Sequence, residues 1–169
     1  MSDATAHNQP TPRHRPNRHW LRDPGHFIAL GGGSGLAPVA PGTFGSLVGV
    51  GFYLLLLPLP VWVGVLVVVA CFGLGIWLCG RTARALGVAD PSAIVWDEIV
   101  AVPIALCGAL GDPTHIVLGF ALFRLFDIWK PWPISWADQQ VKGGLGIMLD
   151  DLGAALLAAG VLAFWDYFP

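Results

Sequence analysis

The feature of this sequence that most limits its possible folds is a long stretch without charge. No Asp, Glu, Lys or Arg occurs between Pro24 and Gly80, and only 12% of the whole chain is charged while 55% is hydrophobic. A typical soluble protein has roughly 25% charged residues, many of them on the outer faces of its helices. A chain of this composition is therefore expected to have lipid as its solvent.

Turn signals divide the apolar part of the chain into five segments. We expect them at about 44–57, 61–80, 94–110, 114–128 and 148–165. Pro58-Leu59-Pro60 cannot continue a helix, so the first two segments should form a hairpin, and Thr114 is expected to cap the fourth. Only 61–80 reaches the roughly 20 residues that span a bilayer outright. We therefore predict an all-α, small multihelical integral membrane protein with about four to five apolar helices, the number of full crossings staying open.

The first 22 residues have a different composition. They contain Arg13, Arg15, Arg18 and Arg22 and lack the apolar core of a signal peptide. Since cytoplasmic segments are rich in Lys and Arg, residues 1–22 are predicted to be a disordered basic cytoplasmic tail. Residues 23–169 are predicted to form a single membrane domain.

Five carboxylates stand where apolar segments begin or end. They are Asp97, Glu98, Asp127, Asp150 and Asp151. If the tail lies in the cytoplasm and successive apolar segments run across the membrane in opposite directions, all five carboxylates lie at the cytoplasmic membrane surface. Several carboxylates in a poorly solvated site are the usual way to hold a divalent cation, so these five are candidate metal ligands.

Each carboxylate also has a purely structural interpretation. Asp97 and Glu98 could complement a helix dipole, and Asp150 could be an N-cap. Asp127 could pair with Arg124 or Lys130, three residues away on either side. Because three acidic positions converge, a purely structural role for all of them together is less convincing than such a role for any one of them.

Arg124 and Lys130 are the cations that flank the acidic cluster. Arg suits bidentate phosphate binding, and Lys supplies a point charge. The alternative for Lys130 is that it only extends its charge to the membrane interface, and Lys142 is interpreted as a lipid-surface charge. No Ser-His-Asp or Cys-His arrangement is evident, so a metal-activated water is the candidate nucleophile for phosphoryl chemistry.

A Gly- and Pro-rich loop at 31–46 precedes the first long apolar segment. Its backbone N–H groups could approach an anion, with Ser34, Thr43 and Ser46 adding hydroxyl groups. It matches neither nucleotide-binding signature, G-x-x-x-x-G-K-[ST] or G-x-G-x-x-G. The alternative is a membrane-entry turn that is rich in helix breakers.

Four motifs resemble, in order, those of the phosphatidylglycerophosphatase A family. They are Gly33-Ser34-Gly35 with Pro41-Gly42-Thr43 and Gly45-Ser46, then Ile94-Val95-Trp96-Asp97-Glu98, then Phe123 to Ile134, and finally Gly143 to Asp151. The family pattern usually has Gly where this chain has Ala101. The resemblance implies a protein of the bacterial inner membrane whose active site faces the cytoplasm. It also implies Mg²⁺-dependent removal of the terminal phosphate from phosphatidylglycerophosphate, giving phosphatidylglycerol.

These observations lead to one mechanistic hypothesis. Asp97, Asp127, Asp150 and Asp151 would hold one or two Mg²⁺ ions, with Glu98 a ligand or the general base. Arg124 and Lys130 would hold phosphate oxygens. The headgroup would contact the loop at Gly33, Ser34, Gly35, Thr43 and Ser46.

Other functions stay open on the sequence alone. The expected partners are phosphatidylglycerophosphate and membrane lipids, not nucleic acid, and the oligomeric state is undetermined. A phosphatase of another lipid headgroup, such as phosphatidic acid, is the nearest alternative. A small membrane transporter or a structural membrane subunit is a further one.

Overall fold

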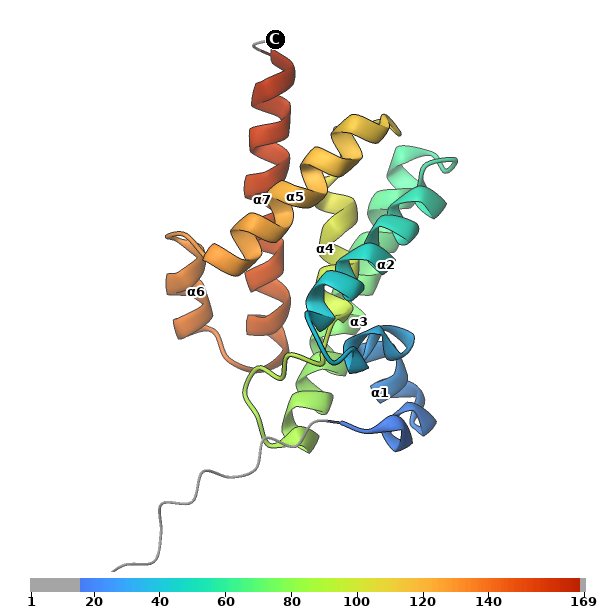
Figure 1. Ribbon diagram of the computed structural model, residues 1–169, viewed down its shortest axis with the longest axis vertical. Coiled ribbons are helices and arrows are strands. Elements are labelled where there is room, and N and C mark those ends of the chain that lie inside the picture. The colour runs from blue at the N-terminus through green and yellow to red at the C-terminus, as the bar shows by residue number, and fades with distance from the viewer. Residues whose placement is uncertain (1–15, 168–169) are drawn as a thin grey trace, which may run out of the picture.

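Helices are the only regular elements between residues 16 and 167 of the computed structural model, which are the residues described (Figure 1). The elements are η1 Arg18–Arg22, α1 Pro24–Ala29, η2 Gly31–Leu36, α2 Pro41–Leu56, α3 Val61–Leu86, α4 Trp96–Ala105, α5 Pro113–Trp129, α6 Ile134–Gln140 and α7 Gly143–Tyr167. The predicted all-α class is confirmed. Of the predicted tail, residues 1–15 lie outside the described residues, and Arg18–Arg22 forms the helix η1.

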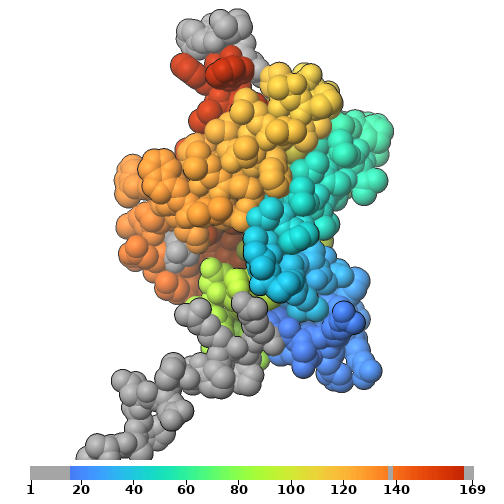
Figure 2. Space-filling model, viewed as in Figure 1, coloured from blue at the N-terminus to red at the C-terminus, as the bar shows by residue number. Residues whose placement is uncertain are grey.

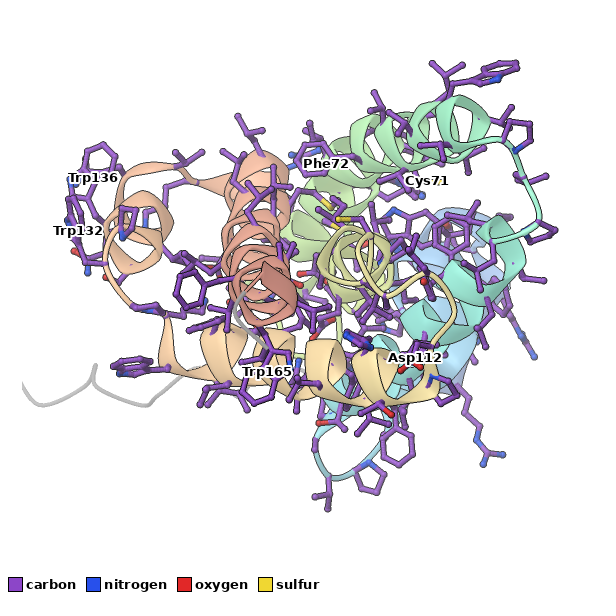
Figure 3. All side chains as sticks on the ribbon, turned by 90° about the horizontal axis from the view of Figure 1, so that it is seen from above. Cys71, Phe72, Asp112, Trp132, Trp136 and Trp165 are labelled. Atoms are coloured by element: carbon purple, nitrogen blue, oxygen red, sulfur yellow. The ribbon has the colours of Figure 1, made fainter. Side chains whose placement is uncertain are left out.

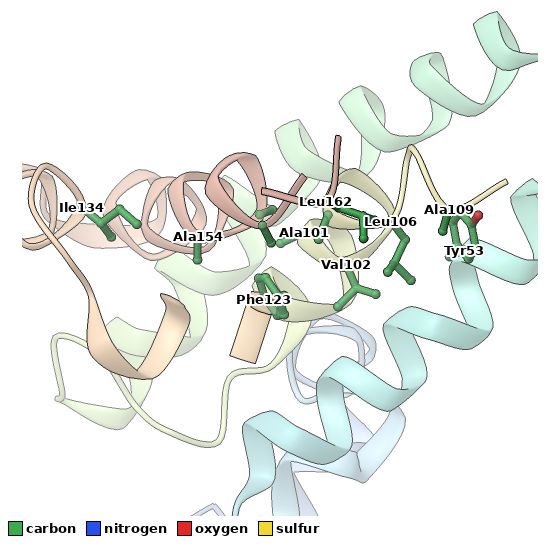
Figure 4. Close-up of a cluster of buried hydrophobic side chains, with 12 residues drawn as sticks. Tyr53, Ala101, Val102, Leu106, Ala109, Phe123, Ile134, Ala154 and Leu162 are labelled. Carbon is green, nitrogen blue, oxygen red and sulfur yellow. The ribbon is translucent and has the colours of Figure 1, made fainter. Parts of the chain in front are cut away.

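Helix α4 lies at the centre of the bundle, packed against α2, α3, α5 and α7. Eight of its ten residues are buried, because neighbours cover it on every side. Val102 of α4 and Leu106, the residue that follows α4, meet Phe123 of α5 and Leu162 of α7 in the main hydrophobic cluster (Figure 4). A short apolar helix is thus held by longer ones, which fixes the position of its first turn.

Two of the described helices are long and apolar enough to cross a membrane. They are α3, and α7 from Gly143 to Trp165; α2 is apolar but shorter. Only 11% of the apolar window of α3 is buried, so most of its hydrophobic surface faces outward. Trp132 and Trp136 also project outward beside α6 (Figure 3). These features suggest association with a membrane.

Several predicted helix limits were wrong. Helix α3 continues beyond Gly80 to Leu86, and α7 begins at Gly143 rather than near Met148. Part of the expected polar connector is the helix α6. The N-cap of α5 is Asp112, not Thr114, because the Asp112 carboxylate accepts a hydrogen bond of 3.0 Å from the backbone N–H of His115.

An ion pair joins the charged end of α3 to the start of α1. The Arg81 guanidinium donates to both carboxylate oxygens of Asp23, at 2.8 and 2.7 Å. The same carboxylate caps α1 by accepting from the N–H groups of Gly25 and His26. Chiefly because Arg81 hydrogen-bonds it, the pKa of Asp23 is lowered from its ordinary value. This pair ties α1 to the end of α3, a contact that segment hydropathy does not reveal.

The start of α7 packs closely against α3. A Cβ atom at Gly144 would overlap the backbone carbonyl of Ile76 in α3, so only glycine allows the two helices to come this close. Gly160 provides a comparison within the same helix, since nothing lies within 4 Å of the position of its Cβ.

We expect Gly144→Ala to lower the free energy of unfolding by about 1–3 kcal/mol, because α3 and α7 must separate to fit the methyl group. Gly160→Ala is expected to leave stability unchanged or raise it slightly. Thermal melting of the two purified variants in detergent measures the difference. Equal melting temperatures would contradict the proposed helix contact.

Candidate active site

The five predicted carboxylates line one cavity of about 340 Å³. Its walls come from the start of α2, the first turn of α4, the end of α5, the first half of α7 and the link before α4. Figure 2 faces the side of the molecule where α2, α5 and that link meet. The five carboxylates therefore converge in the structure, as the order of the apolar segments predicted.

The carboxylates form two groups that share one member. Oxygen atoms of Asp97, Glu98 and Asp151 all lie within 4.8 Å of one another, as do those of Asp127, Asp150 and Asp151. Asp151 is only 4% exposed. Together the two groups include all five side chains, and each group could hold a cation.

Several carboxylate oxygens in this cluster lack a protein partner. Within the described part of the chain, Asp97 Oδ1, Glu98 Oε2 and Asp151 Oδ2 are buried without a hydrogen bond. A buried carboxylate without compensation is costly. Hard divalent cations bind oxygen ligands of this kind, so the donor set fits such an ion.

The two predicted cations contact the cluster directly. Arg124 Nη1 lies 2.5 Å from Asp127 Oδ2 and 3.6 Å from Glu98 Oε1. Lys130 forms an ion pair with Asp150, on a different helix. The pairing of Arg124 with Asp127 that the sequence spacing suggested is confirmed, and both cations line the cavity.

The helices favour some of these positions and not others. Asp97 and Glu98 lie in the first turn of α4, where the helix dipole stabilises negative charge. Asp127 lies in the last turn of α5, where the dipole opposes it and Arg124 compensates. The interpretation of Asp150 as an N-cap is wrong, because α7 begins at Gly143 and Asp150 lies about two turns inside it.

The Gly-rich loop contributes less than expected. Among the described residues that line the carboxylate cavity, the loop supplies Ala40, Pro41 and Gly42, but not Gly33, Ser34, Gly35, Thr43 or Ser46. Gly33 and Ser34 border a separate hollow, and the Ser34 hydroxyl donates to the Gly31 carbonyl. Ser46 is completely buried.

Two charged residues of the cavity wall were not predicted. Asp90 lies in the link before α4, and Lys142, interpreted from sequence as a lipid-surface charge, precedes α7. The sequence around Asp90 shows no periodicity that would indicate its place. For Lys142, the only indication in the sequence was that it lies next to the fourth motif.

Because Asp151 belongs to both carboxylate groups, we expect Asp151→Asn to weaken binding of a divalent cation more than about tenfold. Calorimetric titration of the purified protein in detergent with Mn²⁺ measures this. Asp112→Asn is the matched control, since it removes an exposed carboxylate at the start of α5 while Asn still caps the helix. Equal Mn²⁺ affinities for the two variants would contradict this role of Asp151.

Comparison with known proteins shows a relationship over nearly the whole chain. The chain is 43% identical to a phosphatidylglycerophosphatase A of Escherichia coli K12 over 157 residues, which covers 90% of this chain and 91% of that protein. It is 43% identical to the protein of the same name from Haemophilus influenzae, covering 88% of this chain and 92% of the relative. A putative phosphatidylinositol-3-phosphatase of Bacteroides thetaiotaomicron is 37% identical, covering 82% of this chain and 87% of that protein.

No solved structure matches the chain significantly. The family model described as phosphatidylglycerophosphatase A matches residues 27–166, which include every carboxylate of the cavity. The chain is therefore a member of the phosphatidylglycerophosphatase A family and an enzyme of the phosphatase class.

Proposed function

We propose that this enzyme hydrolyses the terminal phosphomonoester of phosphatidylglycerophosphate in a Mg²⁺-dependent reaction, giving phosphatidylglycerol and phosphate. The observation that carries the proposal is the convergence of five carboxylates with Arg124 and Lys130 in one cavity. The names of the two 43% identical relatives supply the substrate. The reaction belongs to phospholipid biosynthesis.

The donor set supports Mg²⁺ as the cofactor. All the candidate ligands are carboxylates, and several of their oxygens are buried without a protein partner. Asp97, Asp127, Asp150 and Asp151 would hold one or two ions. When bound, Mg²⁺ supplies positive charge that neutralises phosphate oxygens and acidifies water.

Arg124 and Lys130 would bind the phosphate itself. Phosphoryl transfer spreads negative charge over the equatorial oxygens, and fixed cations stabilise that charge. Pro41 and Gly42 bring the positive end of the α2 dipole to the same cavity, where it favours an anion. In this proposal the loop contact with the headgroup is made at Gly42 rather than at Gly33 to Gly35.

Glu98 is our candidate for the general base. It is 9% exposed, belongs to the group with Asp97 and Asp151, and lies near Arg124. It would take a proton from the water whose oxygen forms a bond to phosphorus. The bond from phosphorus to the glycerol oxygen breaks, and that oxygen takes up a proton from solvent, so the products are phosphatidylglycerol and inorganic phosphate.

We place the enzyme in the bacterial inner membrane with the cavity toward the cytoplasm. Two long apolar helices and the outward-facing Trp132 and Trp136 support a location at the bilayer interface. The basic N-terminal segment supports the cytoplasmic orientation. A lipid substrate would keep its acyl chains in the bilayer and extend only its headgroup into the cavity.

We expect purified protein in detergent to release phosphate from phosphatidylglycerophosphate with Mg²⁺ and to stop when a chelator is added. Asp97→Asn should lower kcat/KM by at least about a hundredfold, because it removes a ligand from the carboxylate group. Asp112→Asn serves as the control that keeps full activity. Phosphate release that survives chelation and the Asp97→Asn substitution would contradict the metal-carboxylate site.

Phosphatidylinositol 3-phosphate is a second candidate substrate, suggested by the name of the 37% identical relative. Phosphatidic acid, the alternative considered from sequence, is also a lipid phosphomonoester. We expect kcat/KM to be highest for phosphatidylglycerophosphate when the three lipids are compared in the same mixed micelles. A higher kcat/KM for either other lipid would reassign the substrate.

A further inference from the structure

A fully buried serine contacts Arg124. Ser46, in the second turn of α2, has 0% exposure, and its oxygen lies 3.3 Å from Arg124 Nη1. The Ser46 hydroxyl donates to the backbone carbonyl of Gly42 at 2.8 Å. Because a hydroxyl has a single proton, its oxygen can only accept the hydrogen bond from Arg124.

Two glycines of α2 make this contact possible. A Cβ atom at Gly42 would overlap Glu98 Oε1 and would lie 3.2–3.3 Å from both terminal nitrogens of Arg124. A Cβ atom at Gly45 would lie 2.5 Å from Val95 Cβ and 3.3 Å from Glu98 Oε2. The guanidinium is therefore held between the backbone of α2 and the carboxylates of α4 and α5.

A neutral acceptor differs physically from the carboxylates around Arg124. Asp127 and Glu98 fix the guanidinium but also neutralise its charge. A serine oxygen fixes one N–H group without adding negative charge. The positive charge of Arg124 is then more available to an anion in the cavity.

We propose that Ser46 is a positioning residue, which holds Arg124 in the orientation that receives a phosphate oxygen. This inference rests on the proposed function, and it replaces the expectation that Ser46 itself contacts the headgroup. A serine that merely bonds back to the preceding turn of its own helix would need no partner on α5.

A double-mutant cycle tests the proposal. We expect Ser46→Ala to lower kcat about tenfold in the wild-type enzyme and less than about twofold in Arg124→Lys, because the effect passes through the guanidinium. Ser46→Cys should behave in the same way, since it replaces the oxygen by a somewhat larger sulfur that accepts hydrogen bonds only weakly. Equal losses in both backgrounds, or no loss in the wild-type background, would overturn the proposal.

Thr82→Val is the matched control for these substitutions. It removes another buried hydroxyl, which contacts His26 away from the cavity. Its melting temperature should fall about as far as that of Ser46→Ala, while its kcat stays unchanged. A loss of kcat in Thr82→Val as large as in Ser46→Ala would show that general loosening of the fold explains the effect, which would also overturn the proposal.

Mn²⁺ titration separates this proposal from the proposed function. Without Ser46, Arg124 should pair more fully with Asp127 and Glu98, so Ser46→Ala is expected to weaken Mn²⁺ binding several-fold, and only when Arg124 is present. If Ser46→Ala weakens Mn²⁺ binding only when Arg124 is present, but the enzyme releases no phosphate from phosphatidylglycerophosphate, the proposed function is refuted and the role of Ser46 in positioning Arg124 is kept. If the enzyme releases phosphate, but neither kcat nor Mn²⁺ affinity shows coupling between Ser46 and Arg124, only the role of Ser46 is refuted.

Discussion

The structure depends on one electrostatic constraint, which is an excess of buried negative charge. Among the residues that the structure describes, the cavity is lined by four buried carboxylates and the partly buried Asp127, while its partly buried basic side chains are Arg124 and Lys130. Such an excess in an apolar bundle is unstable unless a further positive charge offsets it. A bound divalent cation would supply that charge, and Asp151 belongs to both carboxylate groups that could hold it. In our account, the same imbalance makes the cavity a site for a phosphate only when the cation is present.

The surrounding fold brings this charge together and limits its cost. Helix α4 is too short to hold its position alone, and α2, α3, α5 and α7 enclose it. Its first turn then presents Asp97 and Glu98 at the positive end of a helix dipole. Glycines in α2 and α7 let these helices come close enough that carboxylates from α4, α5 and α7 share one cavity.

The sequence predicted the site better than the limits of the helices. Alternation of apolar segments was enough to bring Asp97, Asp127 and Asp151 to one face, and three-residue spacing was enough to pair Arg124 with Asp127. Contacts between distant segments were not predictable, because they depend on tertiary packing. The Asp23–Arg81 pair joins α3 to the start of α1, and the position of Asp90 depends on an irregular link. The contact of Ser46 with Arg124 depends on the approach of α2 to α5. Gly33, Ser34 and Gly35, predicted to contact the headgroup, instead border two other hollows, because the path of the chain before α2 carries them away from the carboxylates.

The central claim is that the carboxylates bind the metal on which hydrolysis depends. Anomalous diffraction from crystals of the protein grown with Mn²⁺, under conditions in which Mn²⁺ supports phosphate release, tests it most directly. Our account predicts one or two anomalous peaks within about 2.0–2.6 Å of carboxylate oxygens, with Asp151 among the ligands. Phosphate release in that buffer with no anomalous peak in the cavity would contradict it.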